Sequence, residues 1–100
     1  MKALFNKLGT NTSPEIPRGI AVRFTEDFLI VELRDGRVIS TPLLWYPRLE
    51  NAGAQERATW EWIGSGTGIH WPGLDEDLSV AGMLAGQPSR EFLRGALTAT

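Results

Sequence analysis

The residues best suited to proton transfer lie in the stretch between residues 65 and 79. His70 is the only histidine in the chain, and histidine is the side chain whose ordinary pKa lies nearest to neutral pH. Asp75 and Asp77 follow closely enough to orient its ring, and Ser65 or Ser79 could complete a Ser–His–Asp arrangement on paper. One interpretation of this stretch is therefore a small-ligand site or a minor hydrolase centre built on His70 with Asp75 or Asp77.

The surroundings of these residues favour a structural interpretation. Ser65 lies between glycines and lacks the strand-to-helix elbow that exposes a nucleophilic serine. Ser79 is in the position to cap a helix. His70 stands between Ile69 and Trp71, which is typical of a packed histidine with one ring nitrogen hydrogen-bonded. We therefore expect no enzymatic activity and assign no catalytic residue.

Two other features match ligand-binding sequences only in part. The glycines at 64, 66 and 68 do not have the spacing of a dinucleotide-binding loop, and no lysine lies near them to form a Walker A loop. Three carboxylates at residues 75–77 could ligate a hard cation. An EF-hand loop that began at Asp75, however, would need a bidentate glutamate where Gly86 stands. Because cysteine is also absent, we expect no metal, no cofactor and no disulfide.

The distribution of charged and aromatic side chains favours an interaction surface over a catalytic site. Between Arg57 and Arg90 the chain has four carboxylates and no lysine or arginine, while the formal net charge is −2. The aromatic residues could serve as core, as a protein interface, or as a stacking surface for single-stranded nucleic acid. The predicted interaction surface consists of Trp45, Tyr46, Arg48, His70, Trp71, Asp75, Glu76 and Asp77.

The first half of the chain predicts a three-stranded antiparallel meander. Apolar residues alternate over residues 20–24 and again over residues 28–33. Asp35-Gly36 predicts a tight hairpin turn, after which residues 38–41 return as the third strand. Pro42 ends the meander because it cannot donate a hydrogen bond to a strand ladder.

The second half predicts short helices and a glycine-rich hairpin. Helices are expected over residues 47–52, where Pro47 suits the first helical position, and from about residue 54 to 59, with a weak start because neither Gly53 nor Ala54 supplies a capping oxygen. Strands are expected near residues 60–63 and 69–72. A helix over residues 80–85 has Ser79 as its cap, and the acidic residues 75–77 are expected just ahead of it, where the helix dipole favours negative charge.

These elements predict one small α+β domain. Its antiparallel sheet would combine the meander with the glycine-rich hairpin, and two or three short helices would cover it. We expect a flexible N-terminal arm over residues 1–18, the domain over residues 19–87, and either a tail or a short docking helix over residues 88–100. No stretch resembles a secretory signal or a membrane span, so we expect a cytoplasmic protein.

Several motifs together resemble a known family. They are PLLWYPRL at residues 42–49, ER at 56–57, Trp60, GIHWP at 68–72 and LDEDLSV at 74–80. Their order and spacing are similar to those of the bacterial domain of unknown function 2442, over roughly residues 19–86. The resemblance implies a compact α+β domain in the bacterial cytoplasm with no established activity. Some relatives continue into a helix-turn-helix, and others resemble components of toxin–antitoxin pairs. Here too few residues follow Gly86 for a helix-turn-helix.

The hypothesis we prefer is a non-enzymatic protein-interaction or regulatory module, antitoxin-like or related to transcription. Its partner would be another protein, or a second copy in a homodimer. The alternatives are the His70 site described above and a nucleic-acid-binding accessory domain. The latter requires that the arginines share one face, namely Arg18, Arg23, Arg34, Arg37 and Arg48.

Overall fold

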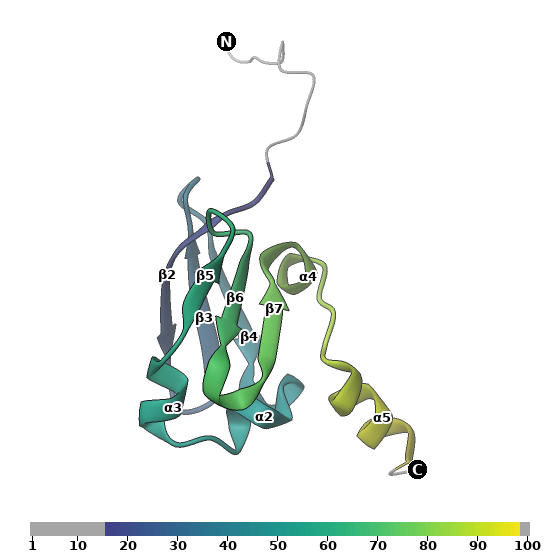
Figure 1. Ribbon diagram of the computed structural model, residues 1–100. Coiled ribbons are helices and arrows are strands. Elements are labelled where there is room, and N and C mark those ends of the chain that lie inside the picture. Colours follow the sequence, from purple (N-terminus) through teal and green to yellow (C-terminus); the bar gives the residue numbers. More distant parts are fainter. Residues whose placement is uncertain (1–15, 99–100) are drawn as a thin grey trace.

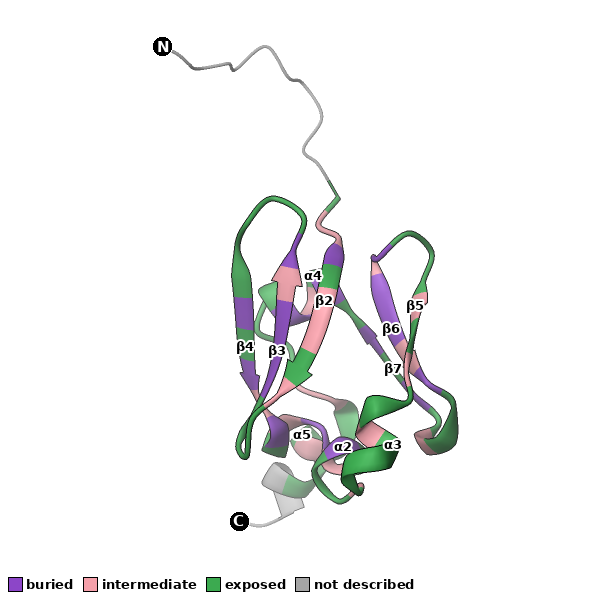
Figure 2. Cartoon of the chain, turned by 90° about the vertical axis from the view of Figure 1, so that its left-hand side faces the viewer, coloured by how far each residue is buried: buried purple, intermediate pink, exposed green. Residues whose placement is uncertain are grey.

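The computed structural model describes residues 16–98, which form two three-stranded antiparallel sheets with short helices at their edges (Figure 1). The first sheet has the strand order β2-β3-β4, with β2 at Gly19–Phe24, β3 at Phe28–Leu33 and β4 at Val38–Pro42. The second has the order β5-β6-β7, with β5 at Glu61–Ile63, β6 at Gly68–Trp71 and β7 at Glu76–Ser79. The two sheets face each other across a shared core (Figure 2). The predicted α+β class is therefore confirmed.

The helical elements are short and lie between and after the strands. They are η1 (Leu43–Trp45), α2 (Pro47–Glu50), α3 (Ala54–Ala58), η2 (Pro72–Leu74), α4 (Val80–Leu84) and α5 (Arg90–Thr98). In α3 the carboxylate of Glu56 accepts a hydrogen bond from the backbone N–H of Gly53, which is one half of a capping box; Gly53 supplies no side-chain oxygen for the other half. None of the helices in this part of the chain is long and apolar enough to cross a membrane.

The predicted meander of the first sheet is present. Val22 lies opposite Val31, which in turn lies opposite Ile39, so the apolar side chains of all three strands point to the same face. The hairpin between β3 and β4 turns at Gly36, whose φ of 96° is accessible to glycine at little cost. Alternation of period two thus buries one face of the sheet, as the sequence indicates.

The second sheet contains a strand that the sequence did not reveal. Residues 75–77 were expected to precede the last helix as a charged entry, but Glu76 and Asp77 belong to β7, which pairs with β6. The chain reverses at Asp75, which adopts a left-handed conformation with φ of 52°. Leu78 thereby comes to lie opposite Ile69. The prediction was wrong because acidic residues seldom form strands, whereas here the pairing with β6 overrides that preference.

The start of α4 agrees with the sequence. The hydroxyl of Ser79 accepts a hydrogen bond from the backbone N–H of Gly82 at 2.7 Å. Leu78 and Met83 lie on either side of the cap in the positions of a hydrophobic staple, and both are buried in the core. Gly86 follows with φ of 73° and ends the helix. The dipole argument for the acidic residues is not needed, since they lie in β7.

The sequence did not determine the structure of either end of the chain. The predicted flexible arm over residues 1–18 lies almost entirely outside the described residues, which begin at Ile16. At the other end, of the two alternatives of tail and docking helix, residues 90–98 form α5. The backbone N–H of Ser89 donates to the carbonyl oxygen of Trp45 at 3.1 Å, which fixes the segment just ahead of α5 to the first half of the chain.

Candidate functional site

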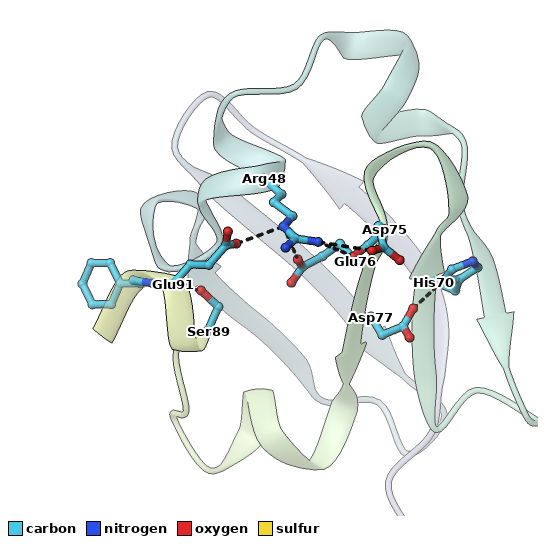
Figure 3. Close-up of polar contacts among 8 residues, drawn as sticks. Arg48, His70, Asp75, Glu76, Asp77, Ser89 and Glu91 are labelled. Carbon is cyan, nitrogen blue, oxygen red and sulfur yellow. Dashed lines mark hydrogen bonds and ion pairs between the residues drawn. The ribbon is translucent and has the colours of Figure 1, made fainter. Parts of the chain in front are cut away.

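A hollow runs alongside β7. It has a volume of about 520 Å³. One wall is formed by all of β7, and the opposite wall by α4, by α5 and by the segment that joins these two helices. Tyr46 and Arg48, which flank the start of α2, also line it. We call this hollow the β7 groove. Figure 3 shows six of its polar residues, namely Arg48, Asp75, Glu76, Asp77, Ser89 and Glu91.

Arg48 crosses one end of the β7 groove and joins its two walls (Figure 3). Its Nε donates to Glu91 of α5 at 3.1 Å, and its Nη1 donates to the backbone oxygen of Asp75 at 2.6 Å. The carboxylates of Asp75 and Glu76 lie 3.7 and 4.0 Å from the guanidinium. Because Pro47 begins α2, Arg48 occupies the second helical position, from which it reaches β7 and α5.

Glu76 is the buried charge of the β7 groove. Its side chain is 11% exposed because the alternation of β7 points it inward, next to Trp71 of β6. Burial raises the pKa of Glu76 above its ordinary value, and the guanidinium of Arg48 opposes this effect. The ionised carboxylate of Glu76 is stabilised by the guanidinium of Arg48, which also pairs with Glu91.

Two buried hydroxyls lie deeper in the same region. The Tyr46 side chain is fully buried, and burial raises the pKa of its hydroxyl, while the neighbouring Thr41 hydroxyl opposes the rise. Within the described part of the chain neither hydroxyl has a hydrogen-bond partner of good geometry. Tyr46 belongs to the hydrophobic core and Thr41 is buried as well, so neither residue offers appreciable contact surface although Tyr46 borders the groove.

Among residues 16–98, no strand pairs with the edge of β7 that faces the groove. The N–H of Val80 donates to the oxygen of Thr67 at 2.9 Å, so these residues form a hydrogen-bonded pair at the end of the β6–β7 ladder. In an antiparallel ladder hydrogen-bonded and non-hydrogen-bonded pairs alternate. The backbone groups of Asp77 and the N–H of Ser79 therefore point away from β6. Residues 76–79 form one of the two edge strands of the second sheet as the structure describes it.

His70 lies on the outer face of the second sheet rather than in the groove. Its Nδ1 contacts the carboxylate of Asp77 on the neighbouring strand (Figure 3), and Glu61 lies opposite it on β5. The hydrogen bond to Asp77 raises the pKa of His70 above its ordinary value. Asp77 lines both the β7 groove and a smaller hollow beside Gly68, but His70 lines neither of these. The expected pocket shared by the imidazole and a carboxylate is thus missing at both hollows.

The predicted interaction surface is divided by the fold. Arg48 and the acidic residues 75–77 are brought together at the β7 groove, and His70 touches this set through Asp77. Trp71 is a correction, because it is fully buried and its indole N–H donates to the backbone oxygen of Arg57 at 2.9 Å. Tyr46 is buried in the same core, and Trp45 packs edge-on against it while remaining partly exposed.

Sequence reasoning missed the contribution of α5 to this site. Glu91 holds Arg48, and Ser89, Arg90 and Arg94 line the groove wall. The available signal in the sequence was the helical spacing of Phe92, Leu93, Ala96 and Leu97. In the structure the hydroxyl of Ser89 accepts a hydrogen bond from the N–H of Phe92 at the start of the helix. That signal predicts a helix but gives no information on where it docks. Among residues 16–98 no three histidine or acidic side chains gather closely enough to hold a metal ion.

Comparisons with known proteins place the fold and leave the activity open. A family model described as protein of unknown function (DUF2442) matches residues 20–89. A crystal structure of a protein of unknown function from Rhodospirillum rubrum is similar, with a TM-score of 0.65 and 32% identity over 75% of this chain and 93% of that one. The solution structure of an uncharacterised protein from Chromobacterium violaceum has a TM-score of 0.66 and 21% identity over 83% and 79% of the two chains. No curated protein matches the chain.

Proposed function

The chain belongs to the DUF2442 family of proteins of unknown function, and for this member we propose a non-enzymatic role in binding another protein through the β7 groove. The single observation that carries the proposal is that a free strand edge opens onto a hollow large enough for several residues of extended chain. Strand addition to such an edge is a recurring way of recognising a partner's peptide segment.

The backbone of β7 supplies the attachment points. The N–H and C=O of Asp77 and the N–H of Ser79 point away from β6, as derived above, and are positioned to pair with an added strand. Exposed strand edges that are not used for binding are usually shielded by charge or covered by other elements. Here the covering segment between α4 and α5 stands off from β7 and leaves the groove between them.

The side chains of β7 define the kind of segment that fits. Asp77 points to the outer face and Leu78 to the core. A partner strand would therefore place a lysine or arginine opposite Asp77, where opposite charges on neighbouring strands attract, and apolar residues beside Leu78 and Met83. The proposed partner is a protein with an extended, amphipathic and partly basic segment. We propose that the protein is bacterial and cytoplasmic; the bacterial origin of both similar structures supports the first part of this proposal.

The alternative of a small hydrolase has weaker support. Nδ1 of His70 is occupied by Asp77, and neither of the hollows lined by Asp77 includes the imidazole. Ser79, the nearest candidate nucleophile on β7, uses its hydroxyl to cap α4. A general base needs a substrate position within hydrogen-bond reach, and these two hollows provide none for His70.

The first experiment is isolation of the protein from native lysate at endogenous expression, followed by identification of stoichiometric companions. We expect a second protein to elute with the chain in a fixed ratio. Recovery of monomer alone would count heavily against the proposal. Elution as a homodimer would indicate that the partner is a second copy of this chain and not a different protein.

A matched pair of variants then tests the groove itself. Asp77→Pro removes the edge-facing N–H, and proline is tolerated on edge strands where that N–H is unpaired. Asp77→Ala removes the same carboxylate but keeps the N–H. We expect Asp77→Pro to abolish binding of the partner, whereas Asp77→Ala should retain most of it. Equal binding by the two variants would contradict strand addition to β7, provided that circular dichroism shows both to be folded.

A further inference from the structure

At the end of the two sheets that lies away from α2 and α3, the β3–β4 and β5–β6 turns lie near the start of β2 (Figure 1). The segment before β2 and the β3–β4 turn supply three arginines to this end. Arg18, Arg34 and Arg37 line a hollow of about 200 Å³. The other residues that line it are Ile16, Pro17 and Asp35. Three arginines and a single acidic residue are thus among the residues that line this hollow. We call these three residues the arginine cluster.

The backbone brings the cluster together from separate turns. The N–H of Arg34 donates to the oxygen of Arg18 at 2.9 Å, which ties the β3–β4 turn to the residue before β2. The β5–β6 turn is tied to the same place, because the N–H of Gly19 donates to the oxygen of Gly66 at 2.7 Å. A side chain at Gly66 would clash with the backbone of Gly19. This close approach brings the Ser65 hydroxyl within reach of Arg18.

Two of the three side chains are held in place, and one is not. Nη1 of Arg18 donates to the hydroxyl of Ser65. Nε of Arg37 donates to the carboxylate of Asp35 at 2.9 Å, and the backbone N–H of Arg37 donates to the same side chain at 3.0 Å. The guanidinium of Arg34 has no partner among the residues that the structure describes. Like charges held together in this way repel each other unless an anion compensates them.

We infer that the arginine cluster binds a phosphate group, either free phosphate or the terminal phosphate of a small phosphorylated metabolite. The planar guanidinium presents paired N–H donors that match the oxygens of a phosphate, which is why arginine is favoured at such sites. The hollow is about the size of one or two phosphate groups and not an extended track. This role is independent of the β7 groove, which lies along a different edge.

The positions of the other arginines favour binding of a single phosphate group over binding of a nucleic acid backbone. The sequence required five arginines on one face for nucleic-acid binding, and only three of those meet here. Arg23 pairs with Glu32 on the outer face of the first sheet, at 3.4 Å, and Arg48 crosses the β7 groove. A polymer backbone needs several cationic contacts in succession, because each neutralised phosphate contributes separately to affinity.

The test is titration of the full chain with inorganic phosphate at low ionic strength, followed by ¹H–¹⁵N NMR. We expect saturable shifts of Arg18, Arg34, Arg37 and Ser65. Arg34→Gln should weaken binding about tenfold or more, since a hydrogen bond to a charged group contributes roughly 1.5–3 kcal/mol. The matched control is Arg23→Gln, which removes an arginine from the same sheet but not from the cluster and should bind as wild type.

Further arms of the same experiment separate the sources of the phosphate. Glucose 6-phosphate binding more tightly than inorganic phosphate would identify a metabolite site, and the reverse order would identify free phosphate. Both results support the inference. Linear shifts without saturation, or equal binding by Arg34→Gln and wild type, would overturn it. A duplex DNA that binds far more tightly, with a steep dependence on salt, would also overturn it in favour of a polyanion surface.

Discussion

The imidazole of His70 and the carboxylate of Asp77 stand at directly opposite positions on β6 and β7 and contact each other across the outer face of the second sheet. Glu61 lies opposite His70 on its other side. The histidine is therefore the centre of an acid–base–acid row that spans all three strands. Such a row stabilises the charged form of the imidazole, and its consequence is a dependence of stability on pH.

The row can be tested through the single histidine. The hydrogen bond to Asp77 raises the pKa of His70 above 6.5. Because the folded-state pKa is the higher one, the stabilisation is fully present below about pH 6.5 and is lost as the pH rises through the folded-state value. We expect the ¹H NMR titration of the imidazole to show the raised pKa, and Asp77→Asn to lower it. A wild-type value at or below 6.5 would contradict the contact.

Ionisation of Glu76 is expected to lower the stability of the fold at neutral pH. Burial raises the pKa of its carboxyl above 4.5, so the fold favours the protonated form, and the ionised form costs stability as the pH rises through the folded-state value. We expect Glu76→Gln to be more stable relative to wild type at pH 7 than at pH 4, as measured by urea unfolding. Glu50→Gln, which removes an exposed carboxylate, is the control. An equal difference at both pH values would contradict the effect of burial.

Trp71 is predicted to be one of the most sensitive positions of the core. Its ring is fully buried and its indole N–H donates to Arg57. Trp71→Phe leaves a cavity and an unpaired carbonyl, and we expect a loss of about 2–4 kcal/mol in the free energy of unfolding. Trp60→Phe, at a half-buried ring that packs edge-on against Trp62 at 4.9 Å, should cost clearly less. Urea unfolding monitored by circular dichroism checks both; similar losses would mean that the ring of Trp71 is not specially placed.

Gly66 and Gly36 form a matched pair for the end of the sheets that carries the arginine cluster. Both have positive φ, at 101° and 96°, so alanine at either position is strained by roughly 1–3 kcal/mol. At Gly66 the new Cβ would also lie 2.5 Å from the backbone oxygen of Gly19, whereas at Gly36 it would meet open space. We expect Gly66→Ala to lower the unfolding temperature more than Gly36→Ala. The opposite order would show that the turn is not seated on Gly19.

The docking of α5 depends on a few contacts that can be removed singly. Arg48 and Glu91 are both 42% exposed, and exposed ion pairs contribute roughly 0.2–1 kcal/mol. We expect Glu91→Gln to speed amide hydrogen exchange in α5 by up to about fivefold, while the amides of β3 exchange as in wild type. Unchanged exchange in α5 would show that its position is set by other contacts, such as the hydrogen bond from Ser89 to Trp45.

The sequence alone determined the features that depend on neighbouring residues. The meander follows from alternation over residues 20–33, and its turn follows from a glycine that must adopt positive φ. The start of α4 follows from Ser79 and from the apolar residues on either side of it. These predictions held because the energies concerned arise between residues that are close in the chain.

Tertiary structure decided the features that depend on distant pairings. From the sequence, Glu76 and Asp77 resemble the residues that precede a helix. In the structure they pair with β6, and this pairing points Glu76 toward the core and Asp77 toward His70. In the same way, Trp71 is buried in the core and not part of the surface, with its indole N–H bonded to Arg57. The ion pair between Arg48 and Glu91 holds α5 against the rest of the domain. Backbone pairing and burial in a shared core outweigh local preference, and their partners lie many residues away in the chain.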